Sequence, residues 1–166
     1  MTLDDLELLL DYNYWARDRV LDAVRPLTAE QYTRKVTSSF PSIRETLVHI
    51  YQSEWVWYTR WHSTSPTERP PAETWPDVPA LEQAWRALET QIRAFVRGLG
   101  ADGIHREIDY RLMSGQPGRS AIWEMAQHFV NHGSYHRGQL TTLLRQVGAA
   151  PPASTDLITF HRLRVK

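Results

Sequence analysis

Two histidines, His132 and His136, stand four residues apart in a stretch whose pattern predicts a helix from residue 120 to about residue 147. Residues at positions i and i+4 lie on the same face of a helix, so both imidazoles can reach one point in space. With this spacing a helix can present two nitrogen ligands to a metal ion. The pair is therefore the first candidate for chemistry in the chain.

The apolar pattern of the same segment decides where the two imidazoles point. One row of residues at seven-residue spacing is apolar apart from a single histidine: Ile122, Phe129, His136 and Leu143. His132 stands seven residues after Met125 on the same core-facing seam. Two histidines at this spacing are often incidental, but two inward-pointing imidazoles both need polar partners. A shared metal ion would be a partner for both rings.

A third ligand is required, because two histidines hold a metal ion weakly. The remaining histidines are His49, His62, His105, His128 and His161. Helical twist turns His128 about 80° away from His136, which suits a supporting or solvent-facing role. His62 and His105 lie near predicted loop or strand ends and are typical surface residues. His49 lies within another predicted helix, beside small residues but off the centre of its apolar stripe, so spacing alone leaves the third ligand open.

Composition limits the classes of function. The chain has 166 residues, enough for one domain over residues 1–166 with a proper core. Nineteen basic and nineteen acidic residues cancel, which argues against nucleic-acid or membrane-surface binding through bulk charge. The chain has no cysteine, so disulfides and thiolate ligands are excluded. No signal peptide or membrane span is predicted from the acidic N-terminus and the lengths of the apolar runs, and we expect a cytoplasmic protein.

Helix start and stop signals predict four long helices. The first begins at Thr2 and ends at Arg25-Pro26, and a short helical start follows at Thr28. The second begins at Ser42, with Glu45 completing a capping box, and ends before a proline-rich loop over residues 63–78. The third begins at Asp77 and is stopped by two glycines, Gly98 and Gly100, and the fourth begins at Ser120 and ends before Gly148.

The pattern changes to alternation between the third and fourth helices. Ile104, Ile108, Tyr110 and Leu112 would lie on one side of a strand, with polar residues on the other. A hairpin turn is predicted over residues 114–118. The tail is apolar enough around Phe160 to pack back on the body. The sequence therefore predicts an all-α four-helix bundle with a short extended or hairpin segment between helices three and four.

Several segments together resemble the DinB/YfiT-like family of small four-helix-bundle metalloproteins. The strongest is the fourth-helix string from His128 to Leu140, with the sequence HFVNHGSYHRGQL. Weaker pieces occur in the expected order and span nearly the whole chain: Asp11-Tyr12-Asn13-Tyr14-Trp15-Ala16, Leu47-Val48-His49 and Asp156-Leu157-Ile158-Thr159-Phe160. The resemblance implies an up-down-down-up bundle and a metal triad of His49, His132 and His136.

The resemblance also implies chemistry. Three neutral imidazoles and an open position are typical of catalytic zinc, although nickel, iron, manganese or cobalt would accept the same ligands. Some relatives transfer low-molecular-weight thiols such as bacillithiol or mycothiol, and others resemble metal-dependent hydrolases. The leading hypothesis is a metal-dependent thiol S-transferase in detoxification or stress response. The alternatives are a hydrolase and a non-catalytic stress protein that binds a metal ion or a small ligand.

Other polar residues are weaker candidates for the site. Glu54 and Glu124 could support the ligands, although exposed or capping positions suit them better. Residues around the histidines of the fourth helix could orient ligands or bind substrate: Asn131, Tyr135, Arg137 and Gln139. Arg137 could equally pair with an acid across the bundle. No catalytic acid or base is assigned from the sequence.

The seven tryptophans predict assembly. So many large apolar side chains exceed what one four-helix bundle readily hides, and zero net charge gives little repulsion between copies. A symmetric homodimer would cover them. The alternative is a monomer in which the proline-rich loop covers the aromatic residues.

Overall fold

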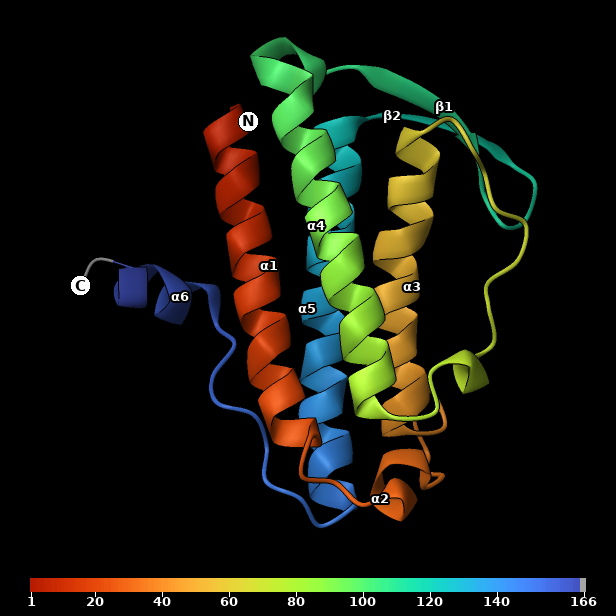
Figure 1. Ribbon diagram of the computed structural model, residues 1–166, viewed down its shortest axis with the longest axis vertical. Coiled ribbons are helices and arrows are strands. Elements are labelled where there is room, and N and C mark those ends of the chain that lie inside the picture. The colour runs from red at the N-terminus through yellow and green to blue at the C-terminus, as the bar shows by residue number, and fades with distance from the viewer. Residues whose placement is uncertain (165–166) are drawn as a thin grey trace.

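The computed structural model describes residues 1–164, which form a bundle of four long helices (Figure 1). Its elements are α1 (Leu3–Val24), α2 (Ala29–Thr33), α3 (Ile43–Trp61), η1 (Ala72–Thr74), α4 (Val78–Gly103), β1 (Glu107–Arg111), β2 (Pro117–Ala121), α5 (Ile122–Gln146) and α6 (Leu157–Arg164). The helices α1 and α5 run one way and α3 and α4 the other. The predicted all-α, up-down-down-up bundle is therefore confirmed.

Two long connections create this order. Residues 62–77, which include η1, return the chain along the bundle so that α3 and α4 are parallel (Figure 1). The hairpin β1–β2 joins α4 to α5 at one end. The helix α5 packs against both α3 and α1, and α1 also packs against α4.

The predicted helix starts are confirmed for the first three long helices. Thr2 accepts a hydrogen bond from the backbone N–H of Asp5, and Asp77 accepts one from that of Ala80. Ser42 caps α3 in the same way. The hydroxyl or carboxylate oxygen in each case satisfies an N–H group that has no partner within the helix.

Two predicted boundaries are wrong. Ser120 does not cap the fourth helix but lies in β2, opposite Ile108, and Ala121 precedes the first helical residue. The Glu124 carboxylate instead accepts the Ala121 backbone N–H at 2.9 Å. The third helix is interrupted at Gly100, whose positive φ of 67° suits only glycine, but helical turns resume and end at Gly103.

The hairpin is confirmed, although it is shorter than the alternating segment. Only Ile108 and Tyr110 of β1 face the body, and Gly118 lies against the Tyr110 ring, where a Cβ would come within 2.6 Å of it. Ile104 is buried just before the strand, whereas Leu112 lies beyond it and is exposed. Two residues of the strand therefore face the body, where the sequence predicted four.

The tail packs on the bundle as predicted, through a short helix that the sequence did not reveal. Phe160 of α6 is buried against Tyr12 and Trp15 of α1, at ring-centroid distances of 5.8 and 5.5 Å. All seven tryptophans are buried or partly buried within one copy of the chain, so the premise of excess tryptophan surface was wrong. Across residues 1–164 every helix is too short or too polar to cross a membrane.

Candidate metal centre

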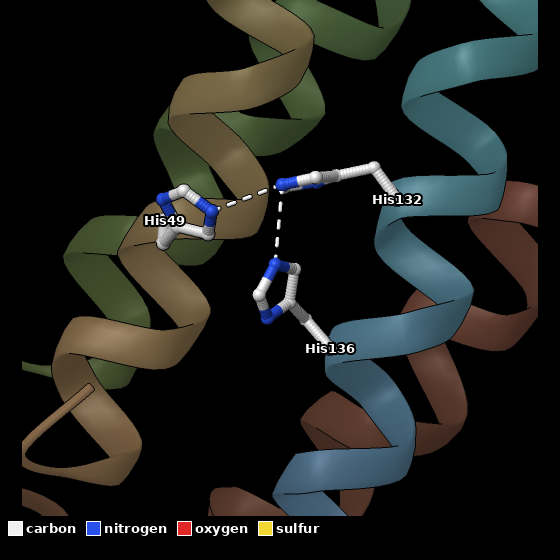
Figure 2. Close-up of side chains that lie close together, drawn as sticks. All are labelled: His49, His132 and His136. Atoms are coloured by element: carbon white, nitrogen blue, oxygen red, sulfur yellow. Dashed lines mark hydrogen bonds between the residues drawn. The ribbon is translucent and has the colours of Figure 1, made fainter. Parts of the chain in front are cut away.

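Three histidines from two helices converge between α3 and α5 (Figure 2). The Nε2 atom of His132 lies 2.9 Å from Nε2 of His49 and 3.1 Å from Nε2 of His136. The available ligand nitrogens of all three lie within 4.8 Å of one another. The structure thus brings together the three residues that the resemblance indicated, in an arrangement that could hold a metal ion.

The donor set suits a cation better than a hydrogen-bonded cluster. Nε2 of His132 has either one lone pair or one proton, yet it faces two ring nitrogens at hydrogen-bonding distance. Nδ1 of His136 lies 2.7 Å from Oε1 of Gln139 and donates its proton there, which leaves a lone pair on Nε2. A cation between the nitrogens would accept every lone pair at once.

Burial keeps these imidazoles neutral, as metal ligands must be. Desolvation, with mutual repulsion among the rings and the charge of Arg69, lowers the pKa of His49 to about 4 and that of His132 to about 3. Burial also lowers the pKa of His136, although its hydrogen bond to Gln139 opposes the shift. The predicted core position is confirmed for His136, whereas His132 is half-buried.

The environment of the triad is partly aromatic. The ring of Phe40 stacks on that of His49 at 4.1 Å between centroids and thereby restricts its orientation. His128 is exposed, and its ring packs edge-on against Trp57 instead of joining the triad. It lies 6.0 Å from the His132 ring, centroid to centroid, as expected for a neighbour one turn away.

A buried polar network in the bundle is centred on Glu54. This side chain is fully buried, so the expectation that it would be exposed or capping is wrong. Its carboxylate accepts hydrogen bonds of 2.8 Å from the Asn13 amide and from the Trp85 indole. Burial raises the pKa of Glu54, while these two donors and the nearby Arg17 and Arg137 oppose the rise.

Arg137 continues this network from α5. Its guanidinium is buried and donates to the Asn13 Oδ1 at 3.1 Å and to the Ser134 Oγ at 2.8 Å. It therefore reaches Glu54 through Asn13 instead of pairing directly with an acid. A Cβ on Gly133 would lie 2.9 Å from the Arg137 Nη1, so glycine at this position leaves room for the guanidinium.

The roles of the other candidates follow from their exposure. Asn131 and Tyr135 are exposed, and Glu124 caps α5, as predicted for it. Gln139 accepts a hydrogen bond from His136, the contact that its predicted ligand-orienting role requires. Sequence reasoning missed Asn13 and Phe40. A polar residue on the apolar face of the first helix could have indicated Asn13, but no signal marked Phe40.

A small pocket opens beside His49. It has a volume of about 260 Å³, and its walls include Phe40, Gln52 and Arg69. The Gln52 side chain donates a hydrogen bond to the carbonyl of Pro70, which ties the proline-rich loop to α3. A small molecule in this pocket would lie against His49.

A four-helix bundle with three histidines converging from its second and fourth long helices is the class of protein that this fold and site define. The model of the DinB family matches residues 1–164, and the chain belongs to that family. It is 28% identical to protein DinB of Bacillus subtilis (strain 168) over 160 residues, covering 92% of each chain. The crystal structure of a DinB-like protein from Bacillus cereus ATCC 10987 has the same fold, with a TM-score of 0.73 at 19% identity, covering 92% of this chain and 97% of that one.

Proposed function

We propose that His49, His132 and His136 bind one divalent transition metal ion and that the protein uses it to activate a low-molecular-weight thiol. One observation carries the proposal: three imidazole nitrogens meet at one point, and within residues 1–164 no fourth histidine or acidic ligand joins them. Structural zinc sites are normally closed by four protein ligands, whereas catalytic sites keep a position open. Three histidine ligands, without a fourth in the described part of the chain, therefore support a catalytic metal site.

Zinc is the metal we propose first. Three neutral imidazoles suit zinc, but they would also accept nickel, iron, manganese or cobalt, because imidazole discriminates weakly among these ions. Elemental measurement on protein purified without a histidine tag identifies the native ion.

The chemistry follows from the neutral ligands. A dication held there lowers the pKa of a thiol or water that reaches its open side. Gln139 holds His136 in the tautomer with a free Nε2, and Phe40 restricts the ring of His49. In the transfer, the thiol releases its proton to solvent and its sulfur forms a bond to an electrophilic carbon. The leaving group departs with its electron pair.

The decisive experiment compares thiol-dependent and thiol-independent chemistry. Zinc-loaded protein is assayed with a panel of low-molecular-weight thiols and a chromogenic aryl chloride, beside the metal-free protein and a His132→Ala, His136→Ala double variant. We expect conjugation that requires both the metal ion and the thiol. Rates equal to those of the double variant across the panel would contradict the proposal.

The same preparations test the two alternatives. Metal-dependent cleavage of ester substrates without a thiol would identify a hydrolase. Metal binding with neither activity would identify a non-catalytic metal- or ligand-binding protein.

We also propose a homodimer, and the reason is the exposed apolar surface of α6 rather than the number of tryptophans. The helix α6 exposes three large apolar side chains, Leu157, Ile158 and Leu163. A second copy that packs on them would remove this surface from water. Light scattering over a dilution series tests the dimer, and a monomeric mass at the highest concentration would exclude it.

A further inference from the structure

The proline-rich loop carries Arg69 to the pocket beside His49. Arg69 lies between α3 and η1, directly before Pro70 and Pro71, and it shares the pocket wall with His49. Prolines restrict the backbone, and the hydrogen bond from Gln52 to the Pro70 carbonyl fastens the loop to α3. The guanidinium is therefore attached to a constrained segment that lines the same pocket as His49.

Arg69 brings a positive charge that the surrounding residues leave unbalanced. Its side chain is exposed, and within residues 1–164 it forms no ion pair. Glu45, the acid that lines the same pocket, pairs with Arg44 instead.

We propose that Arg69 is a second binding point for the substrate and selects thiols that carry a carboxylate. This inference rests on the proposed function, in which the sulfur is bound at the triad. The carboxylate would then accept hydrogen bonds from the guanidinium, whose planar fork matches its two oxygens. A neutral thiol of the same size makes only the first of these contacts and binds more weakly.

A pair of matched thiols separates the two contacts. The probes are 3-mercaptopropionate and 3-mercaptopropionamide, titrated into cobalt-loaded protein, where sulfur-to-cobalt charge-transfer absorption reports thiol binding. At equal thiolate concentration we expect the carboxylate thiol to bind about tenfold more tightly, equivalent to ~1.4 kcal/mol. In Arg69→Gln this preference disappears while the affinity for the amide is unchanged.

Arg34→Gln is the control, because Arg34 is exposed and lies outside the pocket, and we expect it to keep the preference. Equal affinity of the original protein for the two thiols would overturn the role of Arg69 and leave the proposed function standing. If Arg69→Gln lost affinity equally for the carboxylate thiol and for the amide thiol, the selective role of Arg69 would also be overturned. Failure of both thiols to change the absorption would overturn the proposed function and this inference together.

Discussion

Nδ1 of His136 lies 2.7 Å from Oε1 of Gln139, one turn further along α5. An amide oxygen only accepts, so the proton of this imidazole resides on Nδ1 and the lone pair on Nε2. That Nε2 faces His132. The spacing of three residues within one helix therefore sets both the tautomer and the direction of a candidate ligand.

Gln139→Ala should weaken metal binding without abolishing it. Loss of a hydrogen bond that orients a ligating histidine typically lowers metal affinity about 10- to 100-fold. Competition with a chromophoric chelator measures this affinity. Ser39→Ala is the matched control, because it removes the partner of the Gln139 amide nitrogen and leaves the bond to His136 intact. An unchanged affinity in Gln139→Ala would mean that the bond does not orient the ligand.

His49→Ala should remove most of the bound metal, and His128→Ala should not. We expect close to one ion per chain in the original protein, because the three nitrogens define one point. His128 is the control, since it lies beside the triad but packs against Trp57. Elemental analysis after extensive dialysis gives the stoichiometry. Full occupancy in His49→Ala would place the third ligand elsewhere.

Two glycines of α5 should respond oppositely to alanine. Gly133→Ala should destabilise the protein by about 1–3 kcal/mol, because the new methyl group meets a buried guanidinium held by two hydrogen bonds. Gly138→Ala meets nothing within 4 Å and should stabilise the helix by about 0.5–1 kcal/mol. Urea unfolding of both variants tests the pair, and a stabilised Gly133→Ala protein would show that Arg137 moves freely.

The metal-free protein should lose stability as the pH falls below about 6.5. The folded pKa values of His49, about 4, and His132, about 3, lie below the ordinary 6.5. At a pH between the folded and the unfolded pKa values, the unfolded chain binds more protons than the folded one, so acid favours unfolding. The stability that the neutral rings contribute is fully present only above the unfolded pKa. Urea unfolding of chelator-treated protein from pH 7.5 to 5 measures the slope.

His132→Gln should reduce that slope, because it removes one of the triad rings whose pKa is lowered in the folded protein. His105→Gln is the comparison, since His105 is exposed at the end of α4. Identical slopes in the original protein and in His132→Gln would show that the triad does not cause the pH dependence.

Local signals in the sequence were sufficient for the four long helices and for two of the three histidines of the site. Thr2, Ser42 and Asp77 cap helices because their side-chain oxygens meet N–H groups within three residues of themselves. The spacing of His132 and His136 places both on one helix face for the same local reason. At Ser120 the rule failed, because pairing across the hairpin extended β2 through that residue.

The third member of the triad and the polar network around Glu54 were decided by the tertiary structure. His49 stands off the apolar stripe of its own helix, and only the packing of α3 against α5 brings its ring to His132. Glu54 is buried, and its hydrogen-bond partners, Asn13 and Trp85, come from two other helices. The sequence by itself determined the helices and the paired histidines, since these depend on periodicity and on neighbours a few residues away. The convergence of side chains 83 residues apart depends on how whole helices pack, which only the fold specifies.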